Sequence, residues 1–298
     1  MNQPHAVSAP PVSDQHAKPY QSAPDSLICP ASTIFDRAQV SSDLTEAIGQ
    51  AQSEKDVRAA AVDVLTAARD KGRAAIADAF RAQPFASRPT TIAYSWLTDQ
   101  IVELVLMVST ERLHPLPNPT EGERLSLIAV GGYGRGEMAP ESDVDLLFLT
   151  PYKMTPWAES VIESMLYMLW DLKLKVGHAS RTGKDCLRLA KEDYTIRTSL
   201  VEYRYLAGDA ALAEELGQRL WTELFKTTAN EFIEAKLEER ATRHRKQGGQ
   251  RYMVEPNVKE SKGGLRDLQS LYWIAKYVYQ VQDVADLVPL GLFSPEEL

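Results

Sequence analysis

Two aspartates, Asp143 and Asp145, are the residues in this sequence whose type and spacing most clearly predict chemistry. They stand at alternate positions where the apolar run 144–149 begins, and we interpret that run as a short buried strand. Side chains two residues apart on a strand leave the same face, with their Cα atoms roughly 7 Å apart. Carboxylates placed so close together repel unless a cation lies between them, and their oxygens are the ligands that Mg²⁺ prefers. We therefore expect Asp143 and Asp145 to bind a divalent metal.

A glycine-rich turn lies just before the aspartates and follows a second apolar run, 126–130. It contains Gly131, Gly132, Gly134 and Gly136. Glycines allow backbone N–H groups to approach an anion closely, so a phosphate is the expected ligand of this turn. The turn is not a P-loop, because no Gly-Lys-Ser/Thr follows, and it lacks the crossover helix and distant acid of a dinucleotide-binding site. A phosphate-binding turn beside a metal-binding pair predicts a nucleotide-transfer site.

The order of these parts resembles the nucleotidyltransferase superfamily that includes DNA polymerase β. In that superfamily a glycine pair and a neighbouring polar side chain hold the triphosphate, and a spaced pair of aspartates holds two metal ions. The resemblance places Gly131 and Gly132 at the glycine pair. The serine that the superfamily often has there is absent, so we expect Ser142 or backbone N–H groups to replace it. We expect Arg135 to contact the γ-phosphate, because a guanidinium group suits bidentate contact with phosphate.

The superfamily also implies a third carboxylate from a later strand, and the sequence offers two candidates. Glu202 lies in the alternating run 200–207, which reads either as a strand or as the end of a helix. If it is a strand, Glu202 can reach the metal-binding face. Asp193 is the second candidate. The structural alternative for Glu202 is a salt bridge with Arg197 or Arg204.

A second informative stretch, 255–267, carries positive charge where a helix begins. Gly263 and Gly264 precede that helix, and Lys259 and Arg266 lie on either side of them. A helix N-terminus attracts anions, so this stretch could contact phosphate. The alternative is a simple helix-entry turn in which Asp267 is the first-turn acid. The residues alone do not choose between these interpretations.

The strands and helices that we expect around these residues indicate an α+β protein with a small mixed β-sheet. We expect a nucleotidyltransferase core of the DNA polymerase β type over 91–208, with helical regions over 31–90 and 209–298 on either side. A Pro-rich segment, 1–30, reads as a disordered tail. Within the core we expect a helix at 91–113 that packs against the strand at 125–130. A further helix is expected at 157–172, a strand at 175–181 and a single helix at 184–200.

The composition excludes some classes of protein. The formal net charge of −8 over 298 residues argues against a general nucleic-acid binder. No apolar run reaches about 18 residues, so we expect no membrane span. The N-terminus does not read as a secretory signal. The two cysteines, Cys29 and Cys186, are too few and too differently placed to suggest a disulfide, which suits a reducing cytoplasm.

With both stretches considered, the sequence resembles the bacterial PII uridylyltransferase/uridylyl-removing enzymes from about residue 41 onward. The resemblance is carried by the segments 130–137, 142–145, 176–178, 255–260 and 263–267, strengthened by the run 151–157. It implies transfer of UMP from UTP to a tyrosine hydroxyl of the PII nitrogen-signalling protein in the cytoplasm. It also implies two-metal-ion catalysis with Mg²⁺, or alternatively Mn²⁺. Glu202 would complete the second metal site or accept the proton.

The same family removes UMP through a metal-dependent HD domain and senses glutamine through ACT domains. The sequence shows neither after residue 264, so it reads as a fragment from which we expect transfer chemistry only. Two alternatives remain open. One is adenylyl transfer by the same fold, because the base specificity cannot be read from the residues. The other is a catalytically silent regulatory or docking module.

Overall fold

The structure is a computed structural model that describes residues 23–246, 257–281, 284–292, 294 and 296. It is a predominantly helical α+β protein built around one small sheet, which confirms the predicted fold class. The strands are β1 (Ser126–Ala129), β2 (Val144–Thr150), β3 (Val176–Thr182) and β4 (Arg204–Gly208). The helices are α1 (Ala31–Ile34), α2 (Arg37–Gly49), α3 (Glu54–Ala82), α4 (Ser87–Val108), α5 (Gly131–Gly134), α6 (Pro156–Asp171), α7 (Gly183–Glu192), α8 (Tyr194–Val201), α9 (Ala210–Glu223), α10 (Ala229–Lys246) and α11 (Leu265–Tyr279).

The sheet is mixed, with the strand order β3-β2-β1-β4. Strand β1 pairs antiparallel with both β2 and β4, whereas β2 and β3 run parallel. The parallel pair requires a crossover connection, which α6 supplies. The register places Asp145 of β2 directly beside Gly177 of β3. The site that the sequence predicted therefore lies where the sheet is parallel, at the beginning of both strands.

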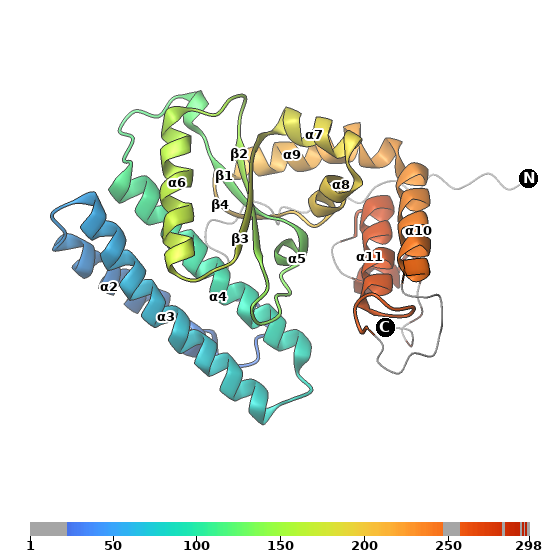
Figure 1. Ribbon diagram of the computed structural model, residues 1–298, viewed down its shortest axis with the longest axis horizontal. Helices are drawn as coiled ribbons and strands as arrows, with labels where there is room; N and C mark the ends of the chain where they lie inside the picture. The colour runs from blue at the N-terminus through green and yellow to red at the C-terminus, as the bar shows by residue number, and fades with distance from the viewer. Residues whose placement is uncertain (1–22, 247–256, 282–283, 293, 295, 297–298) are drawn as a thin grey trace, which may run out of the picture.

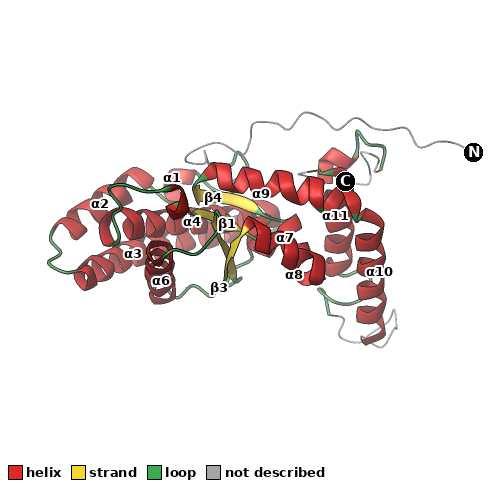
Figure 2. Ribbon diagram, turned by 90° about the horizontal axis from the view of Figure 1, so that it is seen from above, coloured by secondary structure: helices red, strands yellow, loops and turns green. Residues whose placement is uncertain are grey.

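Helices cover both faces of the sheet, so the molecule has three layers (Figures 1 and 2). One face, which includes Leu127 and Phe148, packs in one core with α2, α3, α4 and α6. The opposite face, which includes Ile128 and Leu147, packs in a second core with α7, α8 and α9 and with residues of α10 and α11. Asp145 lies two residues before Leu147 on β2, so both side chains leave the same face, the one covered by α8.

Helix α4 is the central helix of the first core. Of the described residues, the stretch Ser87–Leu113, which is α4 with a π-helical turn (Ser109–Leu113), is long and apolar enough to span a membrane by length and composition. However, 78% of its apolar window is buried inside the protein. The helix packs as expected against the sheet strands, which accounts for its apolar character.

Two expectations about local structure were wrong, and one open alternative is resolved. The helix expected at 184–200 is two helices, because Asp193 ends α7 and caps α8 through the N–H groups of Thr195 and Ile196. The run 200–207, for which a strand and a helix end were both open, contains both, because α8 continues to Val201 and β4 begins at Arg204. The tail expected over 1–30 ends earlier than residue 30, because Ile28 is buried in the first core. Residues 1–22 of that tail lie outside the described residues.

The highly charged helix α10 is attached to α11 by its C-terminal basic residues. Arg243 and His244 both contact the carboxylate of Asp267, which also accepts the N–H of Gly263. These contacts form the entry turn of α11. Much of the preceding segment, including Glu255 and Pro256, lies outside the described residues.

Candidate active site

The carboxylate of Asp145 lies between two glycines. A Cβ atom added to Gly177 would lie 2.4 Å from its Oδ1, and one added to Gly131 would lie 3.3 Å from its Oδ2. Any larger residue at Gly177 would collide with the carboxylate. Gly131 also has a φ of +58°, a conformation that side chains with a Cβ rarely adopt. The two glycines therefore create the space that Asp145 occupies.

Asp143 directly precedes β2 and is exposed, while Asp145 is half-buried. The pKa of Asp145 is raised above its ordinary value, first by burial and then by the negative charge of Asp143. The sequence predicted this repulsion between the two carboxylates. A cation bound by both would relieve it.

The glycine turn forms the single helical turn α5. Its backbone is closed by hydrogen bonds from Gly134 N–H to the carbonyl of Val130 and from Arg135 N–H to that of Gly131. Gly134 approaches the end of α8 so closely that a Cβ atom there would lie 1.8 Å from the carbonyl oxygen of Glu202. Contact between the two backbones thus fixes the turn against α8.

Arg135 and Glu202 form a paired contact behind this turn. Nη1 of Arg135 donates to both carboxylate oxygens of Glu202, at 2.6 and 2.7 Å. Glu202 is only 1% exposed. Nη2 of Arg135 lies near Gly132, where a Cβ atom would be 3.6 Å away. The guanidinium group therefore lies against the glycine turn, held from behind by a buried carboxylate.

A second arginine holds the turn from the opposite side of the sheet. Arg204 of β4 forms a two-pronged salt bridge with the buried Asp99 of α4, at 2.8 and 3.0 Å. It also donates to the carbonyl oxygens of Tyr133 and Gly134, at 3.2 and 3.3 Å. The salt bridge of Glu202 with Arg197 or Arg204, considered as the alternative to a metal role, is not formed, because Glu202 pairs with Arg135 and Arg204 pairs with Asp99. Arg197 pairs instead with Glu231.

Both candidates for the third carboxylate are engaged by other groups. Both oxygens of Glu202 are engaged by Arg135, and Oδ1 of Asp193 accepts two N–H groups at the start of α8. In the register of the sheet, the neighbouring strand β3 presents Gly177 to Asp145. Within the described ranges, no group of three His, Cys, Asp or Glu side chains is arranged to hold a metal.

The other predicted ligand-binding residues are not all brought together. Ser142 adjoins Asp143, and its N–H donates to the carbonyl of Ala139. Lys259 and Arg266 belong to the entry of α11, where Arg266 donates to Gln269 and lies 5.4 Å from the ring of Trp273. Neither lines the cavity that contains Asp145. The alternative of a helix-entry turn with Asp267 describes this segment better.

A cavity of about 250 Å³ opens beside Asp145, between β3 and α8. Its polar lining includes His178 and Arg181 of β3 and Thr195 and Ser199 of α8. None of Arg181, Thr195 and Ser199 was predicted from the sequence as a site residue. The alternation of β3 could have found Arg181, since it leaves the same face as Gly177 four residues earlier.

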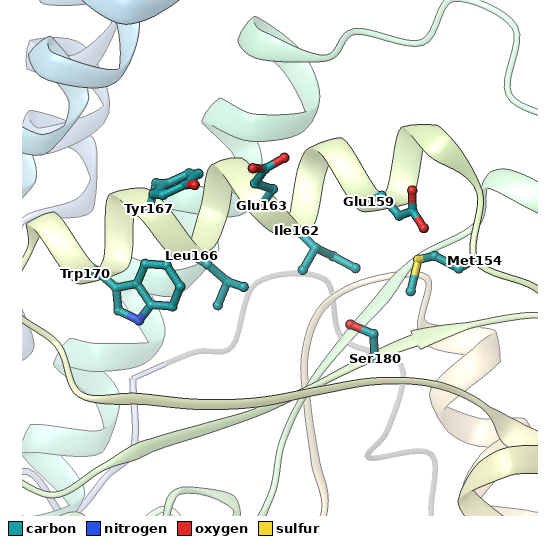
Figure 3. Close-up of a pocket in the computed structure, with 8 residues that line it drawn as sticks. All are labelled: Met154, Glu159, Ile162, Glu163, Leu166, Tyr167, Trp170 and Ser180. Atoms are coloured by element: carbon teal, nitrogen blue, oxygen red, sulfur yellow. The ribbon is translucent and has the colours of Figure 1, made fainter.

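A larger cavity of about 510 Å³ lies on the other side of β3, under α6, and carries no aspartate pair. Figure 3 shows Ile162, Leu166 and Trp170 extending from α6 toward the strand that carries Ser180. Its ionisable residues are Glu159, Glu163 and Tyr167. The aspartate pair therefore adjoins the smaller of these two cavities.

Comparison with known proteins agrees with this geometry. Residues 119–203 match the family described as "Nucleotidyltransferase domain", and residues 231–298 match "GlnD PII-uridylyltransferase". The chain is 64% identical over 264 residues to a protein of Ruegeria pomeroyi named "Bifunctional uridylyltransferase/uridylyl-removing enzyme", covering 89% of this chain and 29% of that protein. It is 58% identical over 273 residues to the protein of that name in Cereibacter sphaeroides, covering 91% and 29%.

The chain therefore spans less than a third of the length of these relatives. The resemblance predicted from sequence is confirmed. So is the presence of an enzyme domain of the nucleotidyltransferase class.

Proposed function

We propose that this chain, a relative of the bifunctional uridylyltransferase/uridylyl-removing enzymes with a nucleotidyltransferase domain of its own, transfers UMP from UTP to a tyrosine hydroxyl of a PII signalling protein. The observation that carries the proposal is the position of Asp145. Its carboxylate lies between Gly131 and Gly177, next to Asp143, at the mouth of a small cavity. The names of the relatives supply the nucleotide, and the family description supplies the acceptor protein.

Asp143 and Asp145 fit a divalent metal ion. Their oxygens are the hard donors that Mg²⁺ takes, with Mn²⁺ as the alternative. The pKa of Asp145 is raised first by burial and then by the charge of Asp143, which a bound cation would offset. When bound by this pair, as one ion or as two, the metal would neutralise triphosphate charge and lower the pKa of the incoming hydroxyl. Ligands beyond these two carboxylates would come from the triphosphate and from water.

The residues around the pair have separate parts in the proposal. The N–H groups of Gly131 and Gly132 at the start of the turn, together with Ser142, face the phosphates, whereas the N–H of Gly134 already donates to the carbonyl of Val130. Arg135 contributes positive charge at the same turn. Glu202 serves as a positioning residue for Arg135 rather than as a metal ligand, since both of its oxygens are occupied. We assign no part to Lys259 and Arg266, which belong to the entry turn of α11, where Arg266 donates to Gln269.

The transfer itself is a substitution at phosphorus. The phenolic oxygen of the acceptor tyrosine attacks the α-phosphorus of UTP and forms a new P–O bond. The bond between the α-phosphorus and the oxygen that bridges to the β-phosphorus breaks, and pyrophosphate leaves with that electron pair. The phenolic proton passes to solvent, to which Asp143 is open. Positive charge at Arg135 stabilises the negative charge that develops on the leaving pyrophosphate.

The proposal places the reaction in the cytoplasm, with the acceptor protein and UTP as partners, and assigns no nucleic-acid or membrane ligand. Both cysteines, Cys29 and Cys186, are free, as a reducing compartment would allow.

The test is to incubate the purified chain with a purified PII protein, Mg²⁺ and UTP labelled at the α-phosphate. We expect label on the PII protein, and none when Asp145 is replaced by Asn or when Mg²⁺ is chelated. Asp171→Asn is the matched control, since Asp171 is an exposed aspartate at the end of α6. Unlabelled PII protein in the presence of the folded, unsubstituted chain would overturn the proposal.

A further inference from the structure

Strand β3 forms one edge of the sheet, and its outer side is open. In the strand order β3-β2-β1-β4, the described residues give β3 a single neighbouring strand, β2. Figure 2 shows β3 at the margin of the sheet, between α6 and α8. None of its residues is buried, whereas every residue of β1 and all but one of β2 are. An open edge presents unpaired N–H and C=O groups to an extended segment that approaches it.

The pairing of β3 with β2 shows which of its backbone groups face outward. The N–H of Val144 donates to the carbonyl of Lys175 at 2.7 Å, so this carbonyl points toward β2. Backbone groups alternate in direction along a strand, and those of Val176, His178 and Ser180 therefore point away from the sheet. The pairing is regular over all seven residues of β3. The opposite edge strand, β4, has five residues, and its pairing with β1 is interrupted by a register shift.

A cavity flanks this open edge on each face of the sheet. The cavity of about 250 Å³ lies on the face of Gly177 and Asp145. The cavity of about 510 Å³ lies on the face of Ser180, under α6. Successive side chains of a strand added outside β3 would point alternately toward the two cavities. Recognition by strand addition has this form, because backbone hydrogen bonds supply affinity and pockets for alternate side chains supply specificity.

Gly177 leaves the path from this edge to the carboxylate of Asp145 free of side-chain atoms. The carboxylate occupies the space of the missing side chain, since a Cβ atom at Gly177 would lie 2.4 Å from its Oδ1. A strand added outside β3 would lie about 4.8 Å further out. A residue of that strand level with Gly177 would point across the glycine toward Asp145. Tyrosine suits this position, because its hydroxyl stands at the tip of a long, rigid side chain.

The larger cavity indicates which side chains would flank that tyrosine. Ile162 and Leu166 of α6 line it with apolar surface (Figure 3). Trp170, also in the lining, is 45% exposed and packs edge-to-face against Tyr167, with 5.8 Å between the ring centroids. Exposed Trp and Tyr side chains beside a groove are typical of protein–protein interfaces. Apolar side chains at the positions next to the tyrosine would therefore be buried here.

Two acidic residues of α6, Glu159 and Glu163, add negative charge to the same cavity. Both are exposed, and neither forms an ion pair with any residue that the structure describes. They lie on the part of α6 that faces Ser180 (Figure 3). Because Ser180 is three residues beyond Gly177, a basic side chain three positions from the tyrosine would meet this charge.

We infer that the outer edge of β3 binds the acceptor segment as a fifth strand of the sheet. The segment is extended and carries the acceptor tyrosine level with Gly177. Its neighbouring positions are apolar, and a basic residue stands three positions from the tyrosine, level with Ser180. The inference rests on the proposed function, which it extends from the reaction to the way in which the acceptor protein is recognised.

The kinetic test measures kcat and KM for a purified PII protein and, separately, the affinity for UTP with Mg²⁺. We expect Trp170→Ala to raise the KM for the acceptor at least about 10-fold and Glu163→Lys about 5- to 20-fold, with UTP affinity unchanged. Tyr279→Ala and Glu234→Lys are the matched controls. Tyr279 is also 45% exposed and Glu234 is exposed, and both lie on α11 and α10, away from β3 (Figure 1). An unchanged thermal unfolding midpoint would confirm that each variant is folded.

Amide hydrogen exchange tests the strand pairing itself. It is measured with UTP and Mg²⁺ in the Asp145→Asn chain, in which we expect no transfer, before and after the PII protein is added. We expect the amides of Val176, His178 and Ser180 to exchange at least about 10-fold more slowly with the acceptor present. The amides of β4, the opposite edge strand, serve as the internal control and should be unchanged.

Three results would overturn the inference alone, while the unsubstituted chain still labels the PII protein. One is an unchanged KM for the acceptor in both Trp170→Ala and Glu163→Lys. Another is unchanged exchange along β3 when the acceptor is added. The third is slower exchange along β3 at rising concentration of the chain without acceptor, which would make this edge a contact between two copies. Absence of label with the folded, unsubstituted chain would overturn the proposed function, and the inference with it.

Discussion

A single nitrogen of Arg135, Nη1, donates to both carboxylate oxygens of Glu202, at 2.6 and 2.7 Å. The carboxylate is buried at the junction of α8 and β4, and the arginine lies on the glycine turn. The contact thus joins two segments 67 residues apart in the chain. Through it, the end of α8 fixes where the positive charge of Arg135 stands.

The first prediction concerns this contact. Replacing Glu202 by Gln removes the buried charge and weakens the hold on Arg135. We expect transfer to slow by about 10- to 100-fold with metal affinity unchanged, because Glu202 does not ligate the metal in our proposal. The measurements are the rate of label transfer and the Mg²⁺ dependence of UTP binding.

A double-mutant cycle with Arg135→Gln completes that test. The two substitutions should be strongly non-additive in rate, since each removes the same contact. A marked loss of Mg²⁺ affinity in Glu202→Gln would instead make Glu202 the missing third ligand.

The second prediction is that Asp145→Asn abolishes transfer and stabilises the metal-free fold at neutral pH. The pKa of Asp145 is raised on folding, so the ionised form is disfavoured in the folded state. Stability is therefore lost as pH rises from the unfolded pKa through the folded one, and the neutral amide avoids that loss. Thermal unfolding with a chelator at pH 7, beside the labelling assay, checks both halves. A lower unfolding midpoint for the variant would contradict the sign.

The third prediction uses the glycine that borders Asp145. A methyl group at Gly177 would lie 2.4 Å from Oδ1 of Asp145, so Gly177→Ala must displace that carboxylate. We expect Mg²⁺-dependent UTP binding to weaken at least about 10-fold. Gly183→Ala, six residues along the chain at the start of α7, is the matched control, because its nearest contact would be an ordinary 3.5 Å. Equal affinity in the two variants would show that the position of Asp145 is unimportant.

The fourth prediction concerns Glu103, a buried residue of α4 whose pKa is raised to about 7. The main cause is burial, partly offset by the charge of Arg37. Because the folded pKa exceeds the ordinary value of 4.5, stability is highest below about pH 4.5 for this group and falls as pH rises through 7. Glu103→Gln should remove a loss of up to about 3 kcal/mol in the free energy of unfolding, because each pH unit between the two pKa values corresponds to about 1.36 kcal/mol.

The check is the free energy of unfolding of both proteins at pH 5 and pH 8. The difference between the two pH values should be smaller in Glu103→Gln than in the unsubstituted chain. Parallel pH dependences would show that Glu103 does not titrate in this range.

Sequence patterns predicted the parts of the fold that depend on local spacing. The apolar runs around Gly131 became β1 and β2, the segment at 175–181 became β3, and α6 appeared where apolar residues recur at helical spacing. The aspartate pair was found for the same reason, since its spacing is local. The resemblance to known nucleotidyltransferases was correctly drawn from these motifs.

The contacts that organise the site were not predicted, because they join residues distant in the sequence. Glu202 could reach the metal only if the run 200–207 were a strand, but it directly follows the last residue of α8 and its carboxylate meets Arg135. Nothing local distinguishes Arg204, which contacts Asp99 105 residues earlier. Lys259 and Arg266 suggested an anion site by their charge at a helix start. In the structure, the start of α11 instead contacts α10 through Asp267.

The salt bridge between Arg204 and Asp99 has a consequence for any attempt to transplant this domain. Arg204 supports two carbonyl groups of the glycine turn and is itself held by a helix whose other contacts lie with α3 and α6. A portable unit cut near residue 90 would keep Asp99 but remove α1, α2 and all of α3, and would expose apolar residues such as Leu97 and Ile101 to water. The smallest unit that keeps the support of the glycine turn therefore begins near residue 27, where the first core begins, well before strand β1.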